Sequence, residues 1–238
     1  MIHQAIVKSG RPIVLSLSPG PTSEGVAQEV SRYAQMWRIS DDLWDYWTND
    51  KGFPRSVHDQ FALAAGWVPF AKPGTWPDAD MLPLGYLGPV PGDGSARSTR
   101  LTHDEQRSLL TLWSMARSPL ILGANLTRLD DWTSALLTNR EVLDLNQLGH
   151  DQRQIASQDG IVVWTSTTGA TTGAGTHYLA FFNLNDEPAS LNRTFAFYGL
   201  SAPAYRAHEV WTGTDLVSSP GLHLSIAPHA CMLLRVTE

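Results

Sequence analysis

A change of pattern near Gly149 constrains the fold of this chain more than any other feature. Before it, short apolar runs alternate with segments of helical spacing, which indicates strand–helix–strand units and a parallel sheet. After it, alternating runs are separated by turn-rich pieces, which indicates an antiparallel β-sandwich without helices. We therefore predict an α/β part over residues 1–150 and an all-β part over residues 151–238.

Local signals place the elements. Lys8 and Gly10 mark the end of a first helix, and Thr102 with Glu105 has the pattern of a capping box that starts another helix. Apolar runs predict buried parallel strands. The expected elements are strands at 12–18, 76–82 and 119–123, helices at 1–9, 26–36, 57–65, from 103 and at 130–146, and sandwich strands at 161–164, 178–182, 194–197, 206–211 and 222–236.

The strongest functional signal is an acidic and aromatic cluster at residues 37–47. It holds three carboxylates, one guanidinium and three indoles within eleven residues. Carboxylates beside aromatic rings suit an enzyme that stacks on a sugar and protonates a glycosidic oxygen. The whole chain has nine tryptophans, an excess that fits carbohydrate binding as well as core packing.

Five blocks of sequence follow one another along the chain: Arg-Pro-Ile-Val-Leu-Ser from Arg11, Trp37-Arg38 with Asp42 and Trp47, Trp-Pro-Asp-Ala-Asp-Met-Leu from Trp76, Ser-Pro-Leu-Ile-Leu-Gly from Ser118, and Asn-Arg-Glu-Val-Leu-Asp-Leu-Asn-Gln from Asn139. In this order they resemble glycoside hydrolase family 27, the retaining α-galactosidases, over essentially the whole chain. The resemblance implies the C-terminal half of a (β/α)8 TIM barrel followed by an antiparallel β-sandwich. Residues 13–18, 38–42, 80–84 and 119–123 then correspond to the fifth strand, the end of the sixth, the seventh and the eighth. Barrel enzymes keep their chemistry at the carboxyl ends of these strands.

The resemblance implies Asp42 as the general acid/base. In the family this aspartate lies four residues after an arginine and five before a tryptophan, and Arg38 and Trp47 both lead to Asp42. We expect Leu43 and nearby indoles to shield this carboxyl from water, which favours the protonated form that a general acid needs. Arg38 is implied as a contact to a sugar hydroxyl that also steadies Asp42.

The simpler interpretation is that the aspartates of this cluster cap the following helix, and we expect that role for Asp41 and Asp45. Asp78 and Asp80 resemble a family segment whose carboxylates organise neighbouring loops and the floor of the site. A carboxylate pair can bind a metal, but hard cations need several further oxygens, so no metal site and no cofactor are expected.

Ser18 is predicted to bind substrate. Typical α-galactosidases end the corresponding strand in a Cys-Glu-Trp-Pro-like sequence whose glutamate reads the sugar 2-hydroxyl, whereas this chain has Leu-Ser-Pro-Gly at residues 17–20. A serine is similarly found in the α-N-acetylgalactosaminidases of the family, where it leaves room for the acetamido group. The rest of the loop matches neither pattern, so this specificity is an alternative.

A retaining mechanism also needs a nucleophilic carboxylate about 5 Å from the acid. In the family it lies in a Lys-x-Asp segment at the end of the fourth strand, upstream of every matched block. We therefore expect a fragment that lacks its N-terminal barrel half, is inactive alone and is marginally stable, aggregation-prone or homo-oligomeric. The open edges of the strands at 13–18 and 119–123 are the physical reason.

Three interpretations stay open: a hydrolase of α-galactoside oligosaccharides or glycoconjugates, a non-catalytic carbohydrate-binding protein, and a structural remnant.

The net charge of −6 comes without a basic cluster, so a nucleic-acid partner is not expected. No apolar run approaches the ~18 residues that span a membrane. The single cysteine, Cys231, lies in an apolar run and reads as a buried, inert thiol. The histidines at 177, 208, 223 and 229 lack ligand spacing. The resemblance implies a secreted or periplasmic protein if the full-length chain carries a signal peptide.

Overall fold

The computed structural model describes residues 1–89, 94–169, 175–200, 205–216 and 221–238. The chain forms two compact units that do not follow chain order. Unit 1 comprises Met1–Thr99 and Arg117–Asn125, and unit 2 comprises Arg100–Ala116 and Leu126–Glu238. The division at residue 150 expected from the sequence stays a prediction. Among the described residues, every helix is too short or too polar to cross a bilayer.

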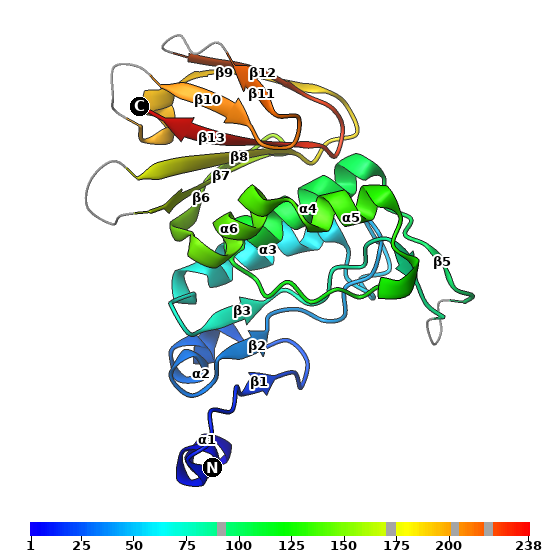
Figure 1. Ribbon diagram of the computed structural model, residues 1–238, viewed down its shortest axis with the longest axis vertical. Helices are drawn as coiled ribbons and strands as arrows, with labels where there is room; N and C mark the ends of the chain where they lie inside the picture. The colour runs from blue at the N-terminus through cyan, green and yellow to red at the C-terminus, as the bar shows by residue number, and fades with distance from the viewer. Residues whose placement is uncertain (90–93, 170–174, 201–204, 217–220) are drawn as a thin grey trace. The chain divides into compact units, whose positions relative to one another are not determined.

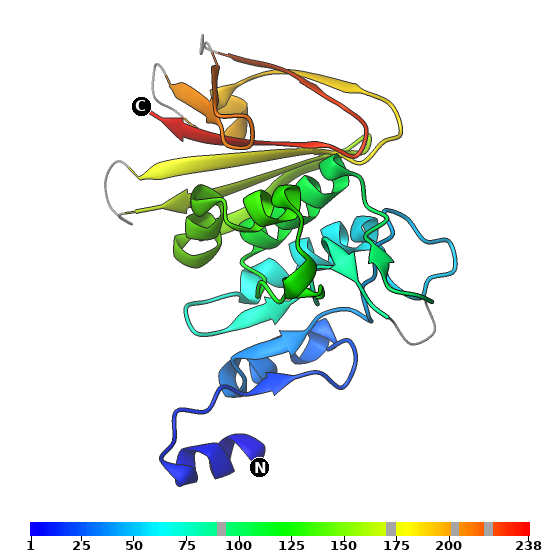
Figure 2. The same ribbon diagram turned by 45° about the vertical axis from the view of Figure 1, so that its right-hand side comes forward.

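Unit 1 is built on a parallel sheet with the strand order β1-β2-β3 (Figures 1 and 2). Its strands are β1 (Ser16–Leu17), β2 (Met36–Arg38) and β3 (Trp76–Asp78), and a hairpin adds β4 (Tyr86–Leu87) and β5 (Arg97–Ser98). Its helices are α1 (Ile2–Ser9), η1 (Glu24–Val26), α2 (Ala27–Tyr33), α3 (Val57–Trp67) and η2 (Val68–Phe70).

The predicted parallel arrangement is confirmed, but three strand assignments are wrong. β1 has two residues, and Ile13 and Val14 are 43% and 62% exposed, so this run is not a buried strand. The strand expected at 76–82 is β3 at Trp76–Asp78, and residues 80–84, expected to correspond to a barrel strand, form only a bridge at Leu82. Residues 119–123 form only one parallel bridge, between Leu82 and Leu122. Strand length depends on paired neighbours, which the apolar pattern alone does not specify.

Local chemistry fixes the helix ends of unit 1. α1 ends at Gly10, which adopts a left-handed φ of 66° that suits a residue without a Cβ. Ser56 and Asp59 form a capping box at the start of α3, since the Ser56 Oγ accepts from the Asp59 N–H at 3.4 Å and the Asp59 Oδ2 accepts from the Ser56 N–H at 3.0 Å. α3 lies against the sheet through indoles, with the ring centroids of Trp37 and Trp67 6.0 Å apart.

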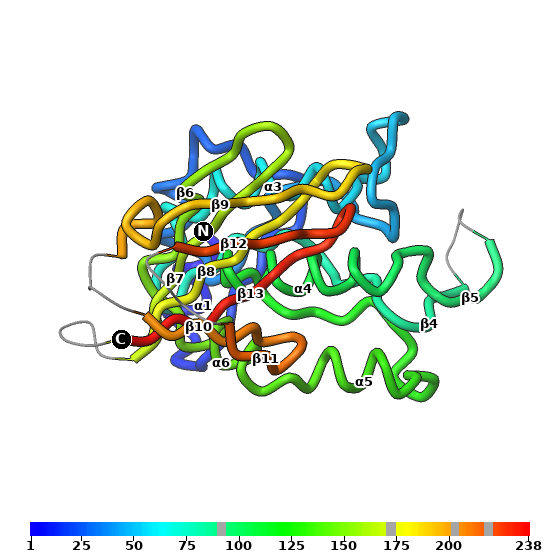
Figure 3. The backbone as a smooth tube through the Cα atoms, turned by 90° about the horizontal axis from the view of Figure 1, so that it is seen from above, coloured from blue at the N-terminus to red at the C-terminus, as the bar shows by residue number. Residues whose placement is uncertain are grey.

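Unit 2 contains a six-stranded antiparallel sheet, ordered β11-β10-β13-β8-β7-β6, and a two-stranded sheet of β12 and β9 (Figure 3). The strands are β6 (His150–Gln158), β7 (Ile161–Thr168), β8 (Thr176–Asn183), β9 (Ala189–Thr194), β10 (Arg206–Glu209), β11 (Thr214–Leu216), β12 (Gly221–Ile226) and β13 (Cys231–Thr237). A core cluster that includes Phe181, Tyr198 and Leu224 fills the space between the two sheets. The predicted sandwich is thus confirmed.

Three helices of unit 2 precede the sandwich in sequence: α4 (His103–Ala116), α5 (Asp131–Leu137) and α6 (Arg140–Leu148), with a short η3 (Leu126–Arg128). The predicted capping box is present, because the Glu105 Oε2 accepts from the Thr102 N–H at 2.7 Å. α4 contacts β13 and β6 to β8, and α6 contacts β7. The helices therefore cover one face of the six-stranded sheet (Figure 1).

Several expectations for unit 2 are wrong in detail. The helix expected at 130–146 is two helices, because Asn139 caps a new start. Strands β6 and β9 lie outside the predicted set. The strand expected at 194–197 is wrong, because β9 ends at Thr194 and the next residues form the 3-10 helix η4 (Phe195–Tyr198). The sandwich is therefore not free of helical turns. η4 ends at Gly199 with a left-handed φ of 81°.

Candidate active site

The predicted site residues lie at the carboxyl ends of the three parallel strands of unit 1. Ser18 follows β1, Arg38 ends β2 and Asp78 ends β3, and Arg38 pairs with Asp78 in the sheet register. The loop after β1 returns to this edge, where the Thr22 N–H donates to the Arg38 carbonyl at 2.9 Å. Parallel strands present their carboxyl ends at one sheet edge, so these residues share one surface.

Arg38 lies between two carboxylates. Its Nη2 is 3.2 Å from the Asp42 Oδ1 and 2.8 Å from the Asp80 Oδ2, and it also donates to the Ser40 carbonyl at 3.2 Å. The side chains of Arg38 and Asp80 are 11% and 14% exposed, whereas that of Asp42 is 63% exposed. The structure therefore brings the predicted pair together and adds Asp80 as a second, less exposed partner of the guanidinium.

Asp80 ties the loop after β2 to the end of β3. Its Oδ2 accepts from the Leu43 N–H at 2.8 Å, and its own N–H donates to the Asp78 Oδ1 at 2.9 Å. Asp80 has a φ of 81°, a left-handed conformation that is strained for a residue other than glycine. These hydrogen bonds hold the strained residue in place after β3 and join it to the loop after β2 that carries Asp42.

Burial shifts the pKa values of Asp78 and Asp80, the two carboxyls next to Arg38 at the end of β3. Loss of solvation is the largest influence on Asp78 and Asp80, and it raises the pKa of each carboxyl above its ordinary value of 3.8. Hydrogen bonds from the backbone and the charge of Arg38 oppose that shift. The two carboxyls that accept backbone hydrogen bonds at the end of β3 therefore both have a raised pKa.

The surroundings of Asp42 differ from the sequence-based expectation. Leu43 is fully buried and Asp42 projects outward, so the expected shielding by Leu43 and the indoles is absent in this chain. Trp37 and Trp47 are buried at 0% and 7% exposure. The Trp47 ring packs on Phe61 at 6.3 Å, so these two indoles are core residues rather than sugar platforms.

Trp44 is the half-buried indole of the cluster. It lines a shallow depression of about 370 Å³ together with Gly88, Pro89 and residues 122–125. This surface belongs to unit 1, as do Arg38 and Asp42. Of the three tryptophans expected to stack on sugar, Trp44 alone has an exposed face in the described part of the chain.

The capping roles expected for Asp41 and Asp45 are wrong. Asp45 is fully buried and forms a two-pronged ion pair with Arg97, with the second contact at 3.0 Å between Nη2 and Oδ1. Asp41 lies 3.6 Å from Arg55, and Ser56 caps α3 instead. Arg97 is 52 residues from Asp45, and no local signal could have linked them.

The neighbouring elements support the same edge. The Ser118 Oγ accepts from the Ala79 N–H at 3.0 Å, and the Gln60 Nε2 of α3 donates to the Ser40 Oγ at 2.9 Å. Ser18 is exposed at the end of β1. Within the described ranges, no three His, Cys, Asp or Glu residues form a group that could hold a metal ion.

Sequence comparison places this geometry in a family. The family model described as alpha galactosidase A matches residues 1–148, more than half of the chain, and the model described as the alpha galactosidase C-terminal beta sandwich domain matches residues 158–236. The chain belongs to the alpha-galactosidase A family. The expected fold, a barrel portion followed by a β-sandwich, is confirmed by this match and by the solved structures of the family.

Individual family members show the same relationship. The chain is 27% identical over 241 residues to Alpha-galactosidase 2 of Arabidopsis thaliana, covering 100% of this chain and 55% of that protein. It is 38% identical to a GH27 β-L-arabinopyranosidase from Geobacillus stearothermophilus, with a TM-score of 0.90, and covers 52% of that chain. A putative α-N-acetylgalactosaminidase from Bacillus halodurans is 33% identical, with a TM-score of 0.78, and the match covers 52% of that chain. This family member thus spans about half the length of the relatives it matches.

Proposed function

We propose that this chain provides the acid/base side of the active site of a retaining glycosidase. Asp42 would donate a proton to the glycosidic oxygen and later accept one from water. Arg38 would hold the Asp42 carboxylate and contact a sugar hydroxyl, and Ser18 would line the pocket at the sugar 2-position. Asp80 and Asp78 would support Arg38 and the loop from below.

One observation carries this proposal. Asp42 projects from the carboxyl edge of a parallel sheet with 63% exposure, while Arg38, which contacts it at 3.2 Å, is buried and held by Asp80. An acid/base residue must reach the substrate yet keep a fixed position. A helix-capping aspartate would instead accept backbone N–H groups at the start of α3, where Ser56 has that role.

We propose further that the nucleophile comes from chain outside these 238 residues, as part of the complementary half of the barrel. Retaining hydrolysis requires two carboxyl groups about 5 Å apart, with the second free to attack. Asp80 does not suit that role, since its Oδ2 accepts from both Arg38 and the Leu43 N–H and its side chain is 14% exposed.

The proposed substrate is a terminal α-linked galactosyl unit. A second candidate is a β-L-arabinopyranosyl unit, which 38% identity to a β-L-arabinopyranosidase favours. The two sugars share their ring configuration and differ in the hydroxymethyl group at C5, so the same acid can serve both. Ser18 at the 2-position makes an α-N-acetylgalactosaminyl unit the third.

The test compares nitrophenyl glycosides of the three sugars in two settings. The purified chain alone is expected to show no turnover. Mixed with the separately expressed N-terminal half of the Geobacillus enzyme, it is expected to hydrolyse the preferred glycoside, and Asp42→Asn is expected to lower that rate at least about a hundredfold. Asp50→Asn, at an exposed position, is the matched control.

Three outcomes would contradict the proposal. Hydrolysis by the chain alone refutes the external nucleophile. Full rate in Asp42→Asn refutes the assignment of the acid. Retained sugar affinity, with no hydrolysis in either the complemented chain or its variant, supports a non-catalytic carbohydrate-binding protein instead.

A further inference from the structure

Unit 2 has a pocket of its own, on the side of α4 and strands β10 to β13. Its volume is about 380 Å³, within the ~300–1,000 Å³ of small-molecule sites. The residues that matter here are Arg107 and Asp104 of α4, Trp211 after β10, Ser225 of β12 and Met232 of β13. All belong to unit 2, so the pocket does not depend on Asp42.

A tryptophan in this pocket has a fixed position. The Trp211 Nε1 donates to the Thr111 Oγ1 at 3.0 Å, and the indole is half-buried. Thr111 in turn contacts the Cys231 Sγ at 3.3 Å. A rigid, partly exposed indole provides an apolar surface at low cost in conformational entropy, which is what the C–H face of a sugar ring requires.

A carboxylate and a guanidinium lie side by side at the same pocket. The Arg107 Nη1 is 3.0 Å from the Asp104 Oδ1, and the guanidinium also lies over the Trp132 ring, 4.5 Å from its centroid. Both side chains keep partial exposure, at 29% and 46%. They present donors and an acceptor together, which matches vicinal hydroxyl groups.

The third charged group of the pocket is already satisfied. The Glu209 Oε2 accepts from the Thr212 N–H at 2.7 Å and its Oε1 from the Leu233 N–H at 3.2 Å, and the residue is 3% exposed. The accessible charges are therefore a balanced pair. A pocket of that kind selects neither a strong anion nor a strong cation.

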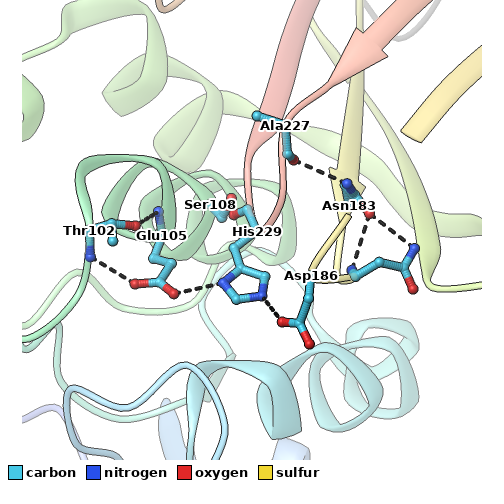
Figure 4. A network of polar contacts seen from close by, with 8 residues as sticks. Thr102, Glu105, Ser108, Asn183, Asp186, Ala227 and His229 are labelled. Atoms are coloured by element: carbon cyan, nitrogen blue, oxygen red, sulfur yellow. Dashed lines mark hydrogen bonds and ion pairs between the residues drawn. The ribbon is translucent and has the colours of Figure 1, made fainter. Parts of the chain in front are cut away.

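The wall of the pocket formed by the β12–β13 turn is fixed to α4 by a polar network (Figure 4). The His229 Nδ1 and Nε2 lie 2.8 Å from the Glu105 Oε1 and the Asp186 Oδ1, and the Ser108 Oγ donates to the His229 carbonyl at 2.7 Å. The Asn183 Nδ2 donates to the Ala227 carbonyl at 3.1 Å. Ala227 and Ala230 line the pocket, so its shape is set before any ligand arrives.

We propose that this pocket binds one neutral pyranose unit, as a non-catalytic carbohydrate site of unit 2. The sugar ring would lie against Trp211, and its hydroxyl groups would bond to Asp104, Arg107 and Ser225. The site extends carbohydrate recognition beyond the catalytic edge of unit 1, and its occupation requires no turnover.

The test uses the whole chain and follows the indole N–H signals of two tryptophans by NMR, assigned with Trp211→Phe and Trp44→Phe. D-galactose and L-arabinose are expected to shift the Trp211 signal saturably at millimolar concentration. Asp104→Asn is expected to weaken this binding about tenfold, whereas Asp215→Asn, 89% exposed on β11 and outside the pocket, leaves it unchanged.

The two tryptophans separate this proposal from the hydrolase proposal. A saturable shift of Trp44 without Trp211 would place the sugar in unit 1 and overturn the new site. An equal shift of Trp211 by inorganic phosphate would overturn neutral-sugar recognition, and equal weakening by both aspartate variants would show that the pocket is not the site. The thermal midpoints of the variants show that each one is folded.

Discussion

At the scale of single residues, the carboxylates of the candidate site differ in their exposure to solvent. Asp42 is exposed, whereas Asp78 is buried and the Asp80 side chain is 14% exposed, and Arg38 contacts both Asp42 and Asp80. Burial raises the pKa of both Asp78 and Asp80 above 3.8. Asp78 and Asp80 accept backbone hydrogen bonds, whereas Asp42 is open to solvent, as the proposed acid requires.

Asp78 gives a pH-dependent prediction. Loss of solvation raises its pKa in the folded chain above the ordinary 3.8, so the folded state binds the proton more tightly than the unfolded state. Its contribution to stability is therefore complete below pH 3.8 and is lost as the pH rises through the raised pKa. Asp78→Asn, which keeps an acceptor for the Asp80 N–H, should gain stability relative to the wild type over that interval.

The measurement is urea unfolding of both proteins at a series of pH values. The difference in free energy of unfolding, variant minus wild type, should rise with pH by about 1.4 kcal/mol for each unit by which folding raises the pKa of Asp78. Thr48→Ser, a change without a titratable group at an exposed position, should give a difference that does not change with pH. A difference that falls with rising pH would show that the charged form of Asp78 is the one stabilised by folding.

At the scale of elements, local signals were good predictors where the bonds are local. Gly10 and the Thr102–Glu105 capping box predicted their helix ends correctly. Asn139, by contrast, was read as part of one long helix, although its Oδ1 accepts from the N–H groups of Glu141 and Val142 at 3.1 and 3.2 Å. An asparagine inside a helical pattern does not by itself reveal a break.

What the sequence could not predict depended on distant partners. The length of β1 depends on whether a second strand lies beside it, and the burial of Trp37 depends on Trp67 of α3, thirty residues away. The positions of Arg38 and Asp42 came from a family motif, whereas the Asp80 contact to Arg38 and the Asp45–Arg97 pair are long-range. Periodicity gives the face of an element, not its neighbour.

The cap of α6 gives a prediction at this scale. Asn139→Ala removes the acceptor for two backbone N–H groups and should lower the free energy of unfolding by about 1 kcal/mol. Asn139→Ser keeps an oxygen in the same place and should recover most of that loss. Chemical denaturation monitored by circular dichroism measures both, and an equal loss in the two variants would show that Asn139 does not act through its cap.

At the scale of the whole molecule, exposed apolar groups gather at the start of unit 1. No residue of α1 is buried, Val7 and Val14 are 66% and 62% exposed, and β1 pairs with β2 alone among the described strands. An open strand edge beside apolar side chains favours association with other chains.

We therefore expect the isolated chain to self-associate. Sedimentation velocity should show an average mass that rises with concentration, and Val14→Lys should reduce this rise, because a charge beside the open edge of β1 opposes pairing. Val26→Lys, 46% exposed on η1, is the matched control. A wild-type chain that stays monomeric at every concentration would contradict the expectation.

The order in which the chain contributes segments to its two units has a consequence for folding during synthesis. The chain leaves unit 1 after Thr99, contributes α4 to unit 2, and returns to unit 1 for Arg117–Asn125. During synthesis, unit 1 stays incomplete until Asn125 has left the ribosome. Helix α4 is made before the strands that it contacts, which are the last part of the chain to be made. Unit 1 is thus completed only after α4 has been made, and unit 2 only when its last strand has been made. Pairing of distant segments slows folding and lengthens the time that apolar surface is available to chaperones.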